Sequence, residues 1–163
     1  MDIKSIIKDK AALYKTEIIA IRRHLHQHPE LSFNEFETAN FVEQKLKEFG
    51  ITKTSRLVKT GVVALIEGKN PSAKVIALRA DLDALPIQEA NDVDYKSKND
   101  GVMHACGHDV HTSSLLGAAK ILHELRNEFE GTIKLIFQPG EEKLPGGASL
   151  MINEGVFENP NVQ

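Results

Sequence analysis

The sequence contains a single cysteine, no long apolar run and no excess of positive charge. One cysteine cannot form an intramolecular disulfide, and no stretch approaches the roughly 20 apolar residues of a membrane-spanning helix. A net charge of −3 does not supply the concentrated basic surface that nucleic-acid binding requires. The N-terminus has mixed charge and lacks the apolar core of a signal peptide. We therefore expect a soluble, cytoplasmic protein that binds neither nucleic acid nor membranes.

Several familiar catalytic motifs are also missing. The sequence has no Gly-x-Ser-x-Gly elbow, no Gly-x-x-x-x-Gly-Lys phosphate loop and no His-Glu-x-x-His helix. It has no internal repeat and no low-complexity segment. What it does have is 163 residues with 41% hydrophobic content, which is enough to build the core of one domain.

Apolar residues at three- and four-residue steps predict helices over residues 3–26, from about 34 to 50, over 111–125 and from 148 to 153. We expect Asn34 to be the N-cap of the second helix, with Glu37 in the capping-box position. Gly50 is placed to end that helix in a left-handed conformation.

Short β-branched runs predict strands over residues 62–66, 75–78 and 132–137, with a further strand within 52–58. Residues 88–100 form a long polar connection without periodicity, which is typical of functional or disordered loops. A strand, a helix and a strand in that order imply a parallel crossover. We therefore expect an α/β fold of three layers, with a mixed, largely parallel sheet and helices on both faces.

Candidate ligands follow the ends of two of these strands. Asp81 and Asp83 lie just past one strand, and Glu141 and Glu142 lie just past the next. Residues 106–108 stand at the entrance to the intervening helix. Ligand sites in open α/β sheets favour this edge, so the topology predicts that the three segments meet there.

Cys106 and His108 offer a thiolate and an imidazole on either side of Gly107, a ligand mixture that Zn²⁺, Mn²⁺, Co²⁺ or Ni²⁺ accepts. A lone cysteine is otherwise often a small buried hydrophobe. Further groups able to bind a metal or orient a ligand surround the pair, and this favours the hypothesis that Cys106 and His108 bind a metal. These groups are His104, Asp109 and His111.

The two acidic pairs differ in geometry. Adjacent residues of an extended segment point to opposite sides, so one of Glu141 and Glu142 can bind metal while the other faces the hydrolytic water. Asp81 and Asp83 are two residues apart and can face the same side, as metal ligands or as partners that orient an imidazole. The alternatives are a solvated acidic turn for the glutamates and a loop cap before Pro86 for the aspartates.

The N-terminal histidines are interpreted differently. On a helix His24 and His28 share a face while His26 points away, so the three cannot converge on one ion, and we expect packing or solvent-exposed roles. A cysteine nucleophile with His104 or His108 as its base is a further hypothesis. That hypothesis leaves both acidic segments without a role, and we rank it below a metal site.

Taken together, these segments resemble the metal-dependent N-acyl-amino-acid amidohydrolases, which include hippurate hydrolases, auxin-conjugate hydrolases and N-acetyl-diaminopimelate deacetylases. Four ordered motifs carry the resemblance. They are RRHLHQHPELS (residues 22–32), RADLDALP (79–86), MHACGHDVH (103–111) and FQPGEE (137–142), the last followed by GGA (146–148).

The resemblance implies a site with two divalent metal ions, Zn, Mn, Co or Ni, that cleaves an amide bond to release an acyl acid and an amino acid. By similarity, Cys106, His108 and Glu142 are metal ligands. Glu141 is the general base that activates water and later protonates the leaving amine. Asp83 matches an aspartate that supports the site and is counted with Glu141 as catalytic. Asp81 stands where related metallopeptidases carry a histidine ligand.

The resemblance also implies a longer protein. Residues 1–163 match the N-terminal portion of a zinc-peptidase-like catalytic domain. Further histidine ligands, the rest of that domain and an inserted lid or dimerisation domain belong to later sequence. We therefore expect a small N-acyl amino acid or peptide as substrate, and a homodimer in the full-length form. The alternatives are a dipeptidase or carboxypeptidase of the same superfamily, and an inactive fragment that binds metal weakly.

Overall fold

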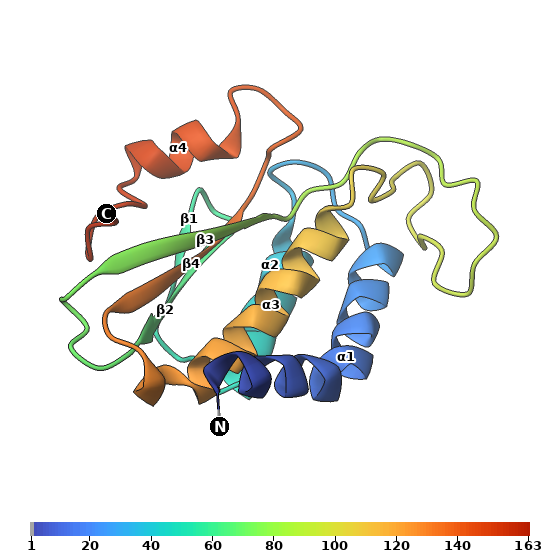
Figure 1. The fold of residues 1–163 in the computed structure, drawn as a ribbon. Coiled ribbons are helices and arrows are strands. Elements are labelled where there is room, and N and C mark those ends of the chain that lie inside the picture. The colour runs from blue at the N-terminus through green and yellow to red at the C-terminus, as the bar shows by residue number, and fades with distance from the viewer. Residues whose placement is uncertain (1) are drawn as a thin grey trace.

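The computed structural model describes residues 2–163. It contains a four-stranded sheet with helices on both faces: α1, α2 and α3 cover one face and α4 lies over the other (Figure 1). None of the helices in this range combines the length and apolar composition needed to cross a bilayer. The elements are α1 (Ile3–Gln27), α2 (Phe36–Glu48), β1 (Thr54–Leu57), β2 (Gly61–Glu67), β3 (Val75–Asp81), α3 (His108–Glu124), the 3-10 turn η1 (Arg126–Glu128), β4 (Thr132–Gln138) and α4 (Gly147–Asn153).

All four helices predicted from periodicity are present, and Gly50 follows α2 with a φ of 87°, as expected. The prediction that Asn34 caps α2 is wrong. The Glu30 carboxylate instead accepts hydrogen bonds from the backbone N–H groups of Glu37 (3.2 Å) and Thr38 (2.7 Å). A carboxylate at this place satisfies free N–H groups of the first turn and interacts favourably with the helix dipole.

The strand order is β1-β2-β4-β3. β3 and β4 are parallel neighbours and α3 connects them, which confirms the predicted crossover. The α/β class, the mixed sheet and the helices on both faces are also confirmed. The expectation of a largely parallel sheet is wrong, because the β1–β2 and β2–β4 pairs are antiparallel. A tight turn at residues 58–60 folds β2 back along β1, and a short apolar run has the same pattern whichever direction it takes.

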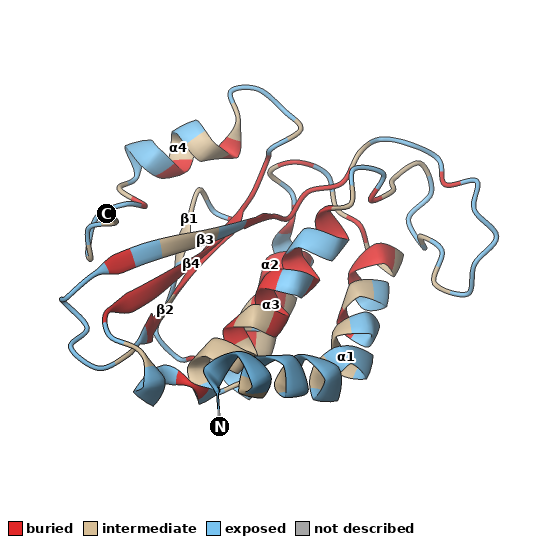
Figure 2. Ribbon diagram, in the orientation of Figure 1, coloured by how far each residue is buried: buried red, intermediate tan, exposed pale blue. Residues whose placement is uncertain are grey.

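The core lies on both faces of β4, all of whose residues are buried. Figure 2 shows buried residues along β4 and on the sheet-facing side of α3, whereas the outer sides of the helices are exposed. Burying a large aliphatic side chain contributes about 1.5–3 kcal/mol, so this packing fixes α3 against the sheet. The smaller apolar cluster beneath α4 contains Val63, Ile136, Met151 and Val156.

Lys134 is the one charged residue of this buried strand. Its side chain is fully buried, and its ammonium group donates hydrogen bonds to the carbonyl oxygens of Val156 (2.9 Å), Glu158 (2.7 Å) and Pro160 (2.9 Å). Burial lowers the pKa of the amine. A buried charge is tolerated where it is fully hydrogen-bonded, and here it fastens the C-terminal turn to β4.

Glu35 is a second buried ionisable residue, located just before α2. Its carboxylate accepts hydrogen bonds from the hydroxyl of Thr60 (2.7 Å) and from the backbone N–H of Gly140 (2.8 Å). Burial raises the pKa of Glu35, and these hydrogen bonds only partly offset the rise. Glu35 thus connects the start of α2 to the segment that follows β4.

The raised pKa of Glu35 gives a testable pH dependence. A carboxyl group whose pKa is raised on folding contributes stability below its unfolded pKa, near 4.5, and loses it as the pH rises through the folded pKa. Glu35→Gln removes this loss. The melting temperature of the variant minus that of wild type should therefore be higher at pH 7 than near pH 4.5. Calorimetry across this range checks the prediction. Glu37→Gln, an exposed change in the first turn of α2, is the control. Equal pH dependence of Glu35→Gln and wild type would contradict the prediction.

Candidate metal centre

Three segments that are distant in the sequence meet where β3 and β4 end. The two parallel strands finish at Asp81 and Gln138, and α3 begins between them in the chain. The structure brings together Cys106, His108 and Glu142, whose thiol, imidazole and carboxylate atoms all lie within 4.8 Å of one another. The crossover topology is the physical cause, because it places both strand ends and the helix N-terminus at one edge.

Gly107 allows two candidate ligands to come from almost adjacent positions. Its φ of 88° lies in the left-handed region, where a residue with a side chain pays roughly 1–2 kcal/mol. This turn leaves Cys106 exposed before the helix and makes His108 the first, buried residue of α3. The spacing noted in the sequence therefore has a conformational reason.

Asp83 fixes the ring of His108. The Nδ1 atom of His108 lies 2.8 Å from the backbone oxygen of Asp83 and 3.2 Å from its carboxylate oxygen Oδ1, so Nδ1 carries the proton and donates it. Burial lowers the pKa of His108, but these contacts outweigh it and the net shift is upward. The opposite nitrogen, Nε2, lies 3.9 Å from the carboxylates of Glu141 and Glu142. It is thus oriented as a metal ligand requires.

The carboxylate of Asp83 also holds two other segments. Its Oδ2 atom accepts hydrogen bonds from the hydroxyl of Ser32 (2.6 Å) and from the backbone N–H of Glu142 (2.9 Å). Burial alone would raise the pKa of Asp83, but hydrogen bonds from His108, Ser32 and the backbone outweigh it and lower the pKa to about 2. Sequence reasoning missed Ser32, although it stands in the first of the four motifs.

The two glutamates occupy different environments, as expected for neighbours in an extended segment. The side chain of Glu142 is 20% exposed and that of Glu141 is 42% exposed. The Oε1 atom of Glu142 is buried and has no hydrogen-bond partner among the described residues, which is unusual for a buried polar atom. Glu142 therefore faces the cluster, while Glu141 lies at its open side.

The donor set fits a divalent transition metal. Cys106 supplies a thiol whose pKa is raised, first by the facing Glu142 carboxylate and then by burial and further carboxylates. A cation would reverse this repulsion and partner the buried Glu142 oxygen. Sulfur, imidazole nitrogen and carboxylate oxygen together are ligands that zinc and its neighbours accept.

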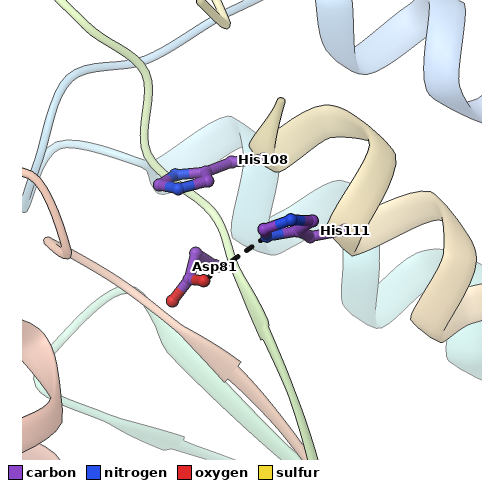
Figure 3. A group of neighbouring side chains, drawn as sticks. All are labelled: Asp81, His108 and His111. Atoms are coloured by element: carbon purple, nitrogen blue, oxygen red, sulfur yellow. Dashed lines mark ion pairs between the residues drawn. The ribbon is translucent and has the colours of Figure 1, made fainter. Parts of the chain in front are cut away.

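A second group consists of Asp81, His108 and His111, drawn in Figure 3. The Oδ2 atom of Asp81 lies 3.5 Å from Nδ1 of His111, and its Oδ1 atom accepts two hydrogen bonds from the Arg79 guanidinium. Because Nδ1 of His108 is protonated, only Nε2 can bind a metal, so His108 can serve one of the two groups. Arg79 already neutralises Asp81, which favours the group that contains Cys106.

His104 does not join either group. Its side chain is buried, and neither ring nitrogen has a hydrogen-bond partner among the described residues. Burial lowers the pKa of His104 to about 4, so the ring is neutral near pH 7. His104 thus stays outside both groups of candidate ligands, although it lies close enough to Asp109, His26 and His108 for their charges to act on its pKa.

The N-terminal histidines have the packing roles that the sequence predicts for two of them. The ring of His24 stacks on Phe41, with centroids 4.2 Å apart, and contacts His28. His26 points away, as predicted, but it is buried and contacts Asp109 and Glu89. No local pattern signals these contacts, because the partners lie 83 and 63 residues away.

Comparison with known proteins defines the family. The sequence model of peptidase family M20/M25/M40 matches residues 77–163, which contain Cys106, His108, Glu141 and Glu142. The chain belongs to this family.

Individual relatives support this family assignment. The chain is 52% identical to an N-acyl-L-amino acid amidohydrolase of Geobacillus stearothermophilus, over 98% of this chain and 43% of the relative. It is 54% identical to a hippurate hydrolase of Campylobacter jejuni, over 87% of this chain and 36% of the relative. The crystal structure of Bacillus subtilis YXEP, a dinuclear metal binding peptidase, superposes with a TM-score of 0.87 at 45% identity, over 93% of this chain and 42% of that one. The chain thus spans about two fifths of the length of the relatives it matches.

The contacts of Asp83 predict the effect of its removal. Asp83→Asn keeps the shape of the side chain but removes its charge, so it can no longer accept from Ser32, Glu142 and His108 together. We expect the affinity for Zn²⁺ to fall about 10–100-fold, as measured by competition with a chelating indicator. Asp81→Asn, two residues away, is the control and should lose less. Wild-type affinity in Asp83→Asn, or a greater loss in Asp81→Asn, would refute the assignment.

Proposed function

We propose that this chain carries part of the active site of a metal-dependent amidohydrolase, which cleaves the amide bond of N-acyl amino acids into an acyl acid and an amino acid. The observation that carries the proposal is the cluster of Cys106, His108 and Glu142 with Glu141 at its open side. The relatives named as amidohydrolases and hippurate hydrolase support this reaction.

Two divalent ions complete the proposed site, and the dinuclear YXEP protein supports that number. Cys106, His108 and Glu142 would contribute ligands, and Zn, Mn, Co or Ni suits these donors. When bound, the ions supply Lewis-acid chemistry, which polarises an amide carbonyl and makes water more acidic.

The remaining steps belong to residues of this chain. Glu141 takes a proton from water as the water oxygen bonds to the amide carbon, and it gives that proton to the nitrogen as the C–N bond breaks. Asp83 holds His108 through Nδ1 and holds the Glu142 backbone. Its role is to keep these groups in position during the reaction.

We further propose that residues 1–163 form the N-terminal portion of the catalytic domain, which the 43% and 36% coverage of the relatives supports. Homodimer formation and a cytoplasmic location stay predictions. A carboxypeptidase or dipeptidase of the same family is a second candidate function, because a thermostable carboxypeptidase 2 of Saccharolobus solfataricus is 46% identical over 96% of this chain. A panel of N-acyl amino acids and dipeptides separates the two activities.

The role of Glu141 is tested in the full-length protein that carries this sequence. Glu141→Gln should lower kcat for N-acetyl or N-benzoyl amino acids by about 10²–10⁴-fold, because the general base is lost, while metal content stays at the wild-type level. The exposed Glu128→Gln change in η1, the turn that follows α3, is the control and should leave kcat unaltered. Wild-type turnover by Glu141→Gln would eliminate this residue as the base.

Metal titration of the 163-residue chain tests whether it binds metal weakly. With three ligand side chains in the cluster, we expect one weakly bound Zn²⁺, since affinity grows with ligand number and geometry. Calorimetry gives both stoichiometry and affinity. Two tightly bound ions would show that these residues are sufficient for the whole centre.

A further inference from the structure

His26 lies between two buried carboxylates on the side of α3 away from the sheet. Its Nδ1 atom is 2.7 Å from Oδ2 of Asp109, and its Nε2 atom is 3.0 Å from Oε1 of Glu89. The side chains of all three residues are at most 4% exposed. The Nε atom of Arg22 makes an ion pair with the same Asp109 oxygen at 2.8 Å.

The distances define what His26 connects. Its ring lies between the two carboxylates, and each ring nitrogen is within hydrogen-bond distance of one of them. The guanidinium of Arg22 lies 3.4 Å from Nδ1 of His26 and pairs with the closer Asp109 oxygen. Arg22 and His26 thus both contact Asp109, and among the described residues His26 alone joins Asp109 to Glu89. The ring of Tyr95 packs beside the cluster: it is nearly perpendicular to the ring of His26, with centroids 5.6 Å apart, and Arg22 lies over its face.

One end of the cluster reaches the metal centre through α3. Asp109 directly follows the ligand His108, and both lie in the first turn of the helix. A displacement of Asp109 therefore moves the backbone of His108.

The other end reaches Cys106 through the long loop. Glu89 accepts a hydrogen bond from the backbone N–H of Ser97 (2.6 Å), and the hydroxyl of Ser97 donates to the carbonyl of Val102 (2.7 Å). The backbones of Leu85 and Met103 then exchange hydrogen bonds, each of 3.0 Å. These contacts fix the conformation of the loop 88–100 and therefore the position at which the chain reaches Cys106.

We propose that His26 is a positioning residue for the metal centre. It bridges the turn that carries His108 and the loop that leads to Cys106, and so fixes the positions of these two proposed ligands relative to each other. The proposal rests on the proposed metal-dependent function. Buried ion pairs are weak evidence for stability, because apolar replacements are often as stable. An apolar side chain cannot hydrogen-bond to two carboxylates from different segments, so it cannot fix the positions of these carboxylates relative to each other.

The test is His26→Gln, because glutamine can donate to only one of the two carboxylates and presents an oxygen to the other. We expect a loss of Co²⁺ affinity of about 10–100-fold and an altered Co²⁺–thiolate absorption spectrum. Thermal unfolding of the same sample is recorded separately. His28→Gln, a change of an N-terminal histidine outside the cluster, is the matched control and should keep the wild-type affinity and spectrum.

Glu89→Gln is the second variant, since it weakens only the loop side and leaves the contact with Asp109. Amide hydrogen exchange of the metal-free protein should rise at residues 97–105 in Glu89→Gln, and at both 97–105 and 107–111 in His26→Gln. This readout remains informative if His26→Gln unfolds, because Glu89→Gln then carries the test.

The outcomes separate the two proposals. Wild-type affinity, spectrum and local exchange in both variants, whatever their melting temperatures, would overturn the role of His26. Full-length wild-type protein that binds no Co²⁺ would overturn the proposed function, while exchange changes in the metal-free variants would still report whether His26 couples the two segments.

Discussion

The candidate site depends on the solvation of one buried charge, the carboxylate of Asp83. Moving an ion out of water costs several kcal/mol unless hydrogen bonds replace the water. In this protein the two donors come from distant places in the chain, the hydroxyl of Ser32 and the backbone N–H of Glu142, and the ring of His108 lies 3.2 Å from the other carboxylate oxygen. The contacts that satisfy Asp83 therefore also bring the segments with the candidate ligands to one point.

A second buried carboxylate reinforces this arrangement from the other side. Asp83 accepts from the N–H of Glu142, and Glu35 accepts from the N–H of Gly140. The residue between these anchors is Glu141, the more exposed of the two glutamates. Backbone on both sides of the proposed base is held, while its carboxylate stays accessible, which is the combination that proton transfer to a substrate requires.

The sequence predicts what local patterns encode. Periodicity located the helices and strands, and the left-handed Gly107 explains the spacing of Cys106 and His108. Contacts made by Ser32, Glu35 and His26 could not be predicted, because their partners lie 51, 105 and 83 residues away. The prediction of strand direction failed for a similar reason. An apolar run does not reveal which strand it will pair with, so β2 could not be recognised as antiparallel to β4.

The first turn of α3 shows why these long-range contacts matter together. His108 and Asp109 are adjacent, yet His108 is held by Asp83 at the sheet edge and Asp109 is held by His26 and Arg22 from α1. An acidic residue in a first turn also interacts favourably with the helix dipole. The turn is thus held by Asp83 on the side of the sheet and by His26 and Arg22 on the side of α1. A side chain held at only one side could rotate with its helix, whereas His108, a proposed metal ligand, has its backbone and its ring fixed by independent networks.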